Sequence, residues 1–183
     1  MKKIGYFIIG LSLLSFGRVY AQKNLVINGG FEDDELTGWN NSSNVAKITP
    51  WDFKSGKGSF AIITTGTGDW IGIDQTIKVP KKAQMLEIGA WIKTNNVVKG
   101  KDSWDGAIFS VEFQDAGGKK IGDGVNITTL TGYQPWALLK QNVKIPPNAV
   151  SFRLLLAMGF ASGTMLIDDV SAKVISADDV TKS

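Results

Sequence analysis

The chain has 183 residues and contains neither cysteine nor histidine. Their absence excludes disulfide bonds, Cys–His pairs, Ser–His–Asp triads and metal sites built on imidazole. Lys2, Lys3 and Arg18 account for three of the 20 basic residues, so the other 17 balance the 17 acidic residues. Such a neutral body, with no basic run beyond lysine pairs, argues against nucleic acid as a partner.

Residues 1–21 have the pattern of a secretory signal peptide. Two lysines precede an apolar stretch, residues 4–16, which is too short to span a bilayer comfortably, and Ala21 supplies the small residue of a cleavage site. No second long apolar run follows. We therefore expect a protein without a membrane span that is secreted, to the periplasm or the cell exterior, after cleavage near Ala21. Residues 22–175 then form one domain, followed by a polar tail at 176–183.

The predicted elements after residue 21 are nearly all strands, because short apolar alternations are bounded by Gly, Asn, Asp and Pro and hardly any helical period occurs. In chain order they cover residues 24–28, 45–48, 58–64, 70–79, 84–94, 106–114, 119–127, 136–145, 149–158 and 164–175. Many short strands at this spacing predict an all-β fold, a β-sandwich jelly roll of about ten antiparallel strands in two sheets.

Alternation along four of these strands also predicts which side chains are buried. The apolar positions of each strand face the core, and the opposite positions carry polar and aromatic groups. The residues of interest on these outward faces are Trp70, Asp74, Trp91, Glu112 and Arg153. A polar strand face that carries aromatic side chains is unusual, and it predicts a binding surface.

Two segments at opposite ends of the domain resemble a known family. Residues 24–32, NLVINGGFE, with the Thr-Gly-Trp at 37–39, resemble the opening of secreted CenC-type carbohydrate-binding modules (families 4 and 9, with family 22 as a cousin). Residues 167–171, IDDVS, resemble their closing strand. The resemblance implies a galactose-binding-like jelly roll, a structural calcium ion (Ca2+) and a polysaccharide or oligosaccharide ligand. It also implies glycoside hydrolases as partners, which here would be separately encoded.

Oxygen-bearing residues at the two ends of the domain predict the calcium site. Glu32 and Asp168 can supply carboxylates, and Gly30 a carbonyl where the first strand breaks; whether Asp168 or its acidic neighbour ligates the ion stays open. The resemblance adds Asp52 and Ser55, from the loop before the third strand. The alternative is that these acidic residues are ordinary solvated groups that prevent edge strands from aggregating.

Sugar-binding sites combine flat aromatic rings with planar hydrogen-bonding side chains. Trp70 is the main candidate for stacking, because it shares a strand face with polar neighbours. Trp104, in the loop at residues 100–106, is expected to form a second wall. Trp91 lies on the same kind of face, but it could equally pack under a loop.

Four polar side chains are the expected hydrogen-bonding partners of a sugar, namely Asp74, Glu112, Gln114 and Arg153. Arg153 is the only arginine after residue 21, and its planar guanidinium suits vicinal hydroxyls or a uronate. A structural ion pair with Glu112 is the alternative role for Arg153.

Three functions remain open at this stage. The first is a secreted, non-catalytic carbohydrate-binding protein stabilised by calcium. The second is an extracellular protein-interaction or adhesion domain, in which the tryptophans form a protein patch. The third is a small glycoside hydrolase or its accessory subunit, because a glycosidase needs only two carboxylates about 5–10 Å apart and Asp74, Glu87 and Glu112 are candidates. Acidic residues on a sugar-binding face are more often hydrogen-bond acceptors, so we expect no enzyme.

Overall fold

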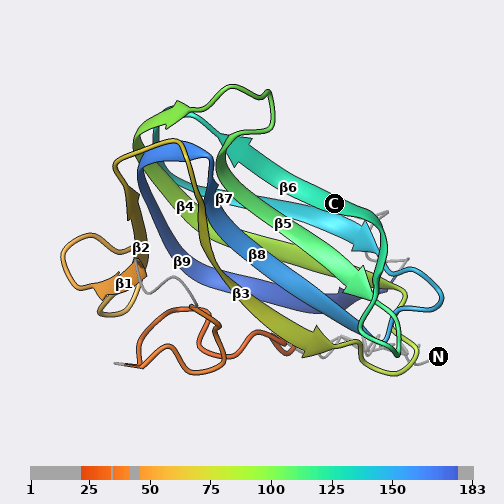
Figure 1. The fold of residues 1–183 in the computed structure, drawn as a ribbon. Coiled ribbons are helices and arrows are strands. Elements are labelled where there is room, and N and C mark those ends of the chain that lie inside the picture. Colours follow the sequence, from red (N-terminus) through yellow and green to blue (C-terminus); the bar gives the residue numbers. More distant parts are fainter. Residues whose placement is uncertain (1–21, 34, 42–45, 177–183) are drawn as a thin grey trace, which may run out of the picture.

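The computed structural model describes residues 22–33, 35–41 and 46–176; the predicted signal peptide and nearly all of the polar tail lie outside these ranges. The described residues form nine strands (Figure 1). They are β1 (Ala46–Thr49), β2 (Ser59–Thr64), β3 (Trp70–Lys78), β4 (Met85–Lys99), β5 (Gly106–Gln114), β6 (Lys120–Leu130), β7 (Gly132–Lys144), β8 (Ser151–Gly159) and β9 (Ala161–Ile175). Over these ranges, no helix is long and apolar enough to cross a membrane.

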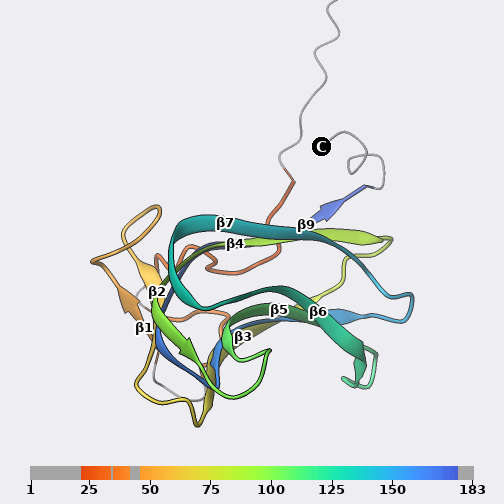
Figure 2. The same cartoon turned by 90° about the horizontal axis from the view of Figure 1, so that it is seen from above.

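The strands form two antiparallel sheets that pack face to face (Figure 2). The five-stranded sheet has the order β1-β2-β9-β4-β7, and the four-stranded sheet has the order β3-β8-β5-β6. Strands that follow one another in sequence often lie in opposite sheets, as β2 and β3 or β8 and β9 do, which is the connectivity of a jelly roll. The predicted all-β sandwich is therefore confirmed, with nine strands in the described residues rather than about ten.

The predicted strand at residues 24–28 is the one that is wrong. Leu25 donates a backbone hydrogen bond to Ala172 of β9 at 2.8 Å, so the segment runs beside the last strand. Asn28, however, has a φ of 48°, in the left-handed region that turns a chain out of a β ladder. The two ends of the domain meet as expected, but the first of them is a bend and not a strand.

The core lies between the two sheets, and it consists of the side chains that alternation predicts to face inward. Side chains with less than 2% exposure come from both sheets, among them Phe60, Leu86, Ile88, Phe109, Phe152 and Leu154. Each such side chain contributes about 1.5–3 kcal/mol by leaving water. Because the inward positions are filled in this way, the alternate positions of the same strands must face outward, and these build the candidate site.

Candidate functional site

The outer face of the four-stranded sheet brings together six of the seven residues predicted to bind a sugar. The pairing of β3, β8 and β5 aligns their outward side chains in rows across the sheet. From one end of the sheet to the other the rows are Trp70–Gly159–Gly106, Gly72–Ala157–Ile108, Asp74–Leu155–Ser110, Thr76–Arg153–Glu112 and Lys78–Ser151–Gln114. One end of the face is therefore small and apolar, while the other end is charged.

The indole of Trp70 has a defined position on this face. A methyl group on Gly159 would lie 2.7 Å from Cζ3 of Trp70 and 2.6 Å from Cδ1 of Ile108, so the indole rests where only a glycine leaves room. Phe160 supports the ring from the side, with 6.2 Å between ring centroids in an edge-on arrangement. The indole nevertheless remains 47% exposed. It is thus a supported aromatic surface that faces solvent.

Two hollows flank Trp70, and together they form what we call the groove. The larger hollow, about 260 Å³, is lined by Trp70, Trp104, Ile108, Ser110, Glu112 and Asn126, among others. The smaller hollow, about 100 Å³, is lined by Trp70, Gly72, Asp74, Arg153, Leu155 and Ala157, with Ile73 beneath. The groove therefore has an apolar floor, a polar rim and two tryptophans, since the 62% exposed Trp104 shares the larger hollow with Trp70.

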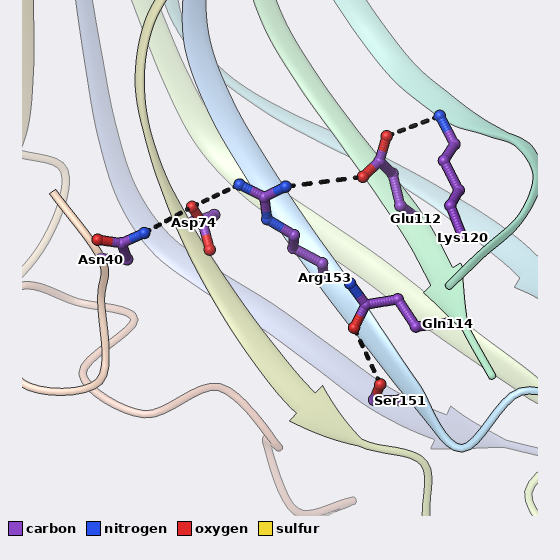
Figure 3. Close-up of polar contacts among 7 residues, drawn as sticks. All are labelled: Asn40, Asp74, Glu112, Gln114, Lys120, Ser151 and Arg153. Atoms are coloured by element: carbon purple, nitrogen blue, oxygen red, sulfur yellow. Dashed lines mark hydrogen bonds and ion pairs between the residues drawn. The ribbon is translucent and has the colours of Figure 1, made fainter. Parts of the chain in front are cut away.

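A chain of ion pairs crosses the groove (Figure 3). The guanidinium of Arg153 donates to Asp74 at 2.8 Å and lies 3.9 Å from Glu112. Glu112 is also paired with Lys120 at 2.7 Å, and Asn40 donates to Asp74 at 3.3 Å. The hydrogen bond with Asp74 is the main reason that the pKa of Arg153 is raised. The ion pair with Glu112 does form, but Asp74 is the closer partner.

Trp91 lies elsewhere, on β4 of the five-stranded sheet, and it does not join the groove. The ammonium of Lys54 is 4.2 Å from its ring centroid, a cation–π contact made by the loop before β2. Trp91 thus contacts a loop, and it also lines a separate hollow of about 510 Å³ with Leu138 and Lys140. Glu87 is on the same strand and pairs with Lys140 at 3.0 Å. It is therefore not on the same face as the groove carboxylates.

Asp168, the most buried of the predicted metal ligands, is held by backbone donors. Its Oδ2 accepts hydrogen bonds from the amides of Lys54 and Ser55 at 2.8 and 2.9 Å, and its Oδ1 accepts one from the amide of Asp169 at 2.7 Å. Burial raises the pKa of Asp168, and these hydrogen bonds oppose the rise. The carboxylate joins the loop before β2 to β9.

Three more predicted ligands lie near Asp168. The hydroxyl of Ser55 donates to Asp169 Oδ1 at 3.0 Å, and a methyl on Gly30 would lie 3.6 Å from that same oxygen. Both carboxylate oxygens of Glu32 accept from the amide of Lys57, at 3.0 and 2.9 Å. We call Gly30, Glu32, Ser55, Asp168 and Asp169 the terminal cluster.

Asp52 does not join the terminal cluster. Its carboxylate pairs with Lys93 at 2.6 Å and accepts from the indole of Trp136 at 2.9 Å. Burial acts to raise the pKa of Asp52, but the two hydrogen bonds outweigh it, so that the pKa is lowered. The acidic residue beside Ser55 and Gly30 is Asp169 and not Asp52.

The donor set of the terminal cluster consists of oxygens, which fits the chemistry of calcium. The geometry is less complete, because backbone amides already occupy the carboxylates of Glu32 and Asp168. Throughout the described ranges, no three acidic side chains gather closely enough to hold a metal ion. If calcium binds here, the carbonyl of Gly30 and the side chains of Ser55 and Asp169 have to complete its coordination.

The floor of the groove was missed by reasoning from the sequence. The floor is formed by Gly72, Leu155 and Ala157. These residues are small or apolar, so the sequence did not mark them as binding residues, although their alternation with core residues places them on the outward face. The available signal was the run of small residues at outward positions of two strands, Gly72 on β3 and Ala157 and Gly159 on β8. A strand that is small on one face leaves space for a ligand there.

Comparison with known proteins defines the class of fold. No protein-family profile matches the chain, and neither does any curated protein. Among solved structures, similar folds are jelly-roll carbohydrate-binding modules, which confirms the resemblance to such modules predicted from the two ends of the domain. At the identities observed, this likeness establishes the fold alone.

Three solved structures illustrate the likeness. TmCBM61 in complex with β-1,4-galactotriose is 18% identical, with a TM-score of 0.56 over 84% of this chain and 99% of that one. The CBM22-1 xylan-binding domain from Paenibacillus barcinonensis Xyn10C is 20% identical, with a TM-score of 0.56 over 86% and 97%. The enzymatically active domain of bacteriophage CBA120 tailspike protein 4 is 20% identical, with a TM-score of 0.63, but the match spans only 21% of that chain and 83% of this one.

Proposed function

We propose that the protein is a secreted, non-catalytic carbohydrate-binding protein that holds a polysaccharide in the groove of the four-stranded sheet. The observation that carries this proposal is the larger hollow, where two exposed tryptophans, Trp70 and Trp104, flank an apolar floor with polar groups at its rim. Flat rings offer a sugar contact area at a small entropic cost. Among the modules of similar fold, TmCBM61 forms a complex with β-1,4-galactotriose and the CBM22-1 domain is a xylan-binding domain, which supports a glycan here.

The charges of the groove favour a neutral glycan. Arg153 already bonds Asp74 and approaches Glu112, which in turn pairs with Lys120. The charges of these two positive and two negative groups cancel. None of them is therefore an unpaired cation that could bind the carboxylate of a uronate. We therefore assign Arg153 to hydroxyl groups, with its orientation set by the two carboxylates.

A catalytic role is disfavoured by the same ion pairs. Asp74 and Glu112 are both engaged in ion pairs with Arg153, whereas a glycosidase needs a carboxyl group free to give a proton to the leaving group. Glu87 is on the other sheet. Glycoside hydrolases are instead proposed as partners encoded separately.

We further propose that calcium stabilises the domain at the terminal cluster. Two adjacent acidic residues, Asp168 and Asp169, lie at the point where both ends of the domain meet, and burial raises the pKa of the first. A divalent cation would offset the cost of holding these charges together. Its role is structural, because the cluster is formed by the five-stranded sheet and its loop, whereas the groove lies on the four-stranded sheet.

The alternative is an adhesion or protein-interaction domain, and one observation favours it. Trp51 is 89% exposed in the loop after β1, away from the groove, beside Phe53 with 40% exposure. Exposed aromatic residues of this kind are typical of protein interfaces. In that case Trp51, and not Trp70, would be the residue whose removal abolishes binding.

Affinity electrophoresis against a panel of polysaccharides tests these proposals together. We expect a neutral glycan to retard the protein, with retardation lost in Trp70→Ala and Trp104→Ala and kept in Trp51→Ala. An absence of retardation by every glycan would favour the adhesion domain. Release of reducing sugar that is lost in Glu112→Gln would instead establish a hydrolase.

A further inference from the structure

Asp105, the residue just before β5, is buried without adequate partners. It is 3% exposed. Its Oδ2 accepts one hydrogen bond, from the amide of Asp102 at 2.9 Å, while its buried Oδ1 accepts none from the described residues. None of the ion pairs found in those residues includes it. An ionised carboxylate taken out of water in this way needs a positive partner.

The comparison with Asp168 shows that the fold can satisfy a buried carboxylate. Asp168 is 0% exposed, and it accepts three backbone amide hydrogen bonds, two at Oδ2 and one at Oδ1. Asp105 accepts one such bond, at Oδ2, and its Oδ1 has no hydrogen-bond partner among the described residues. This difference points to a partner for Asp105 that is not part of the polypeptide.

The other oxygen of the same carboxylate, Oδ2, lies close to a second protein oxygen. A methyl group on Gly100 would lie 2.7 Å from Oδ2 of Asp105 and 2.7 Å from the main-chain carbonyl oxygen of Phe160. Glycine at position 100 thus lets a carboxylate oxygen and a main-chain carbonyl oxygen approach the same point with no side chain between them. Both oxygens are acceptors only, and they are of the hard type that Ca2+ prefers.

We propose that the loop at residues 100–106 and the turn at Phe160 together bind a hard cation, Ca2+ or one of similar chemistry, through the Asp105 carboxylate and the Phe160 carbonyl. With one carboxylate ligand, the site brings little negative charge to the cation. This agrees with the part of the chain described, where no group of three acidic residues could hold a metal ion. Water molecules complete the coordination. The expected Kd is therefore about 10⁻⁴–10⁻³ M, as in extracellular calcium modules.

The cation would connect the two aromatic walls of the groove. The loop that supplies Asp105 also carries Trp104, and Phe160 packs edge-on against Trp70. A bond from the loop to the turn would fix the spacing of the two tryptophans, so that less conformational freedom is lost when a ligand binds. This coupling to the glycan rests on the proposed function, whereas the cation site itself does not.

Terbium luminescence excited through tryptophan tests the cation site without any glycan. The full chain carries Glu32→Gln, so that the terminal cluster is weakened. We expect saturable Tb³⁺ emission that Ca2+ displaces, with affinity at least about tenfold lower after the isosteric change Asp105→Asn. Emission should also fall in Trp104→Phe, because Trp104 adjoins Asp105 and is the natural energy donor. Glu87→Gln, which removes an acid from the opposite sheet, should leave emission unchanged.

Emission that is unchanged by Asp105→Asn would overturn the proposal. Should Asp105→Asn fail to fold, Trp104→Phe decides instead, because undiminished emission there places the ion elsewhere. A glycan affinity that rises with Ca2+ only while Asp105 is present supports the coupling. Terbium binding at Asp105 with no retardation by any glycan would contradict the proposed function and leave the cation site standing.

Discussion

The six-membered ring of Trp70 lies against Gly159, and an added methyl group there would be 2.7 Å from Cζ3 and 2.9 Å from Cε3 of the indole. The most important aromatic side chain of the groove is thus seated by the smallest residue of the neighbouring strand. Both atoms belong to a side chain, so the contact controls the orientation of the ring and not the path of the backbone. Gly159 is therefore a positioning residue for Trp70.

Gly159→Ala should weaken glycan binding without unfolding the protein. The new methyl group displaces the indole and the end of Ile108, and we expect an affinity about tenfold lower, equivalent to roughly 1.4 kcal/mol of stacking. Isothermal titration calorimetry with the glycan found by electrophoresis measures this. Gly68→Ala is the matched control, because a methyl group there meets nothing within 4 Å. Equal affinity in both variants would contradict the seating of Trp70.

Arg153→Gln should destabilise the domain more at low than at high salt. The change leaves Asp74 and Glu112 without their shared cation, and a loss of about 1–3 kcal/mol in the free energy of unfolding is expected near pH 7 at low salt. Salt screens the repulsion between the two partly exposed carboxylates, so the loss should shrink at high salt. Urea unfolding at the two salt concentrations tests this. A loss that does not change with salt would mean that Arg153 acts through packing alone.

Removal of calcium should lower Tm, and the effect should depend on pH in a defined direction. Without calcium, burial raises the pKa of Asp168 above 3.8, so its contribution to stability is present below that pH and is lost as pH rises through the folded-state pKa. Bound calcium stabilises the ionised form instead. The difference in Tm with and without chelator should thus be large near pH 7 and small near pH 4. Glu32→Gln should remove most of this difference in Tm. If chelator leaves the Tm of the unsubstituted protein unchanged, calcium does not bind at the terminal cluster.

Asp52→Asn tests whether Asp52 belongs to the calcium site. Its lowered pKa means that the ionised carboxylate stabilises the fold above about pH 3.8 and that this contribution is lost as pH falls below that value. We expect a loss of about 1 kcal/mol near pH 7, since the Lys93 pair is partly exposed. Calcium affinity should stay unchanged, in contrast to Glu32→Gln. If Asp52→Asn lowers calcium affinity as much as Glu32→Gln does, Asp52 is a calcium ligand.

A panel that contains neutral and uronate-bearing glycans tests the charge balance of the groove. We expect a neutral chain to bind with little dependence on salt, because Asp74 and Glu112 are paired with Arg153 and Lys120. A uronate chain should not bind more tightly than its neutral counterpart. Tighter binding of the uronate, weakened by salt and lost in Arg153→Gln, would show that Arg153 leaves Asp74 for the ligand.

The sequence predicts the sandwich and the inward faces because alternation is a local property of each strand. It could not tell that Trp70 and Trp91 face away from each other, since alternation shows which side of a strand is exposed but not to which sheet the strand belongs. The seat of Trp70 depends on the pairing of β3 with β8, two strands far apart in the sequence. The contacts of Asp52 were not predictable for a similar reason, because they depend on how its loop lies against Lys93 of β4 and Trp136 of β7.

Both ends of the described chain belong to the layer opposite the groove. The segment that begins at residue 22 runs beside β9, and β9 itself ends the domain in the five-stranded sheet (Figure 2). A tether at either end, whether to a resin, a fluorophore or another polypeptide, would therefore leave the tryptophans open to solvent. Tension applied through both ends would load the hydrogen bonds of residues 24 and 25 with β9 before those of the four-stranded sheet, so the groove would stay intact while the protein is pulled.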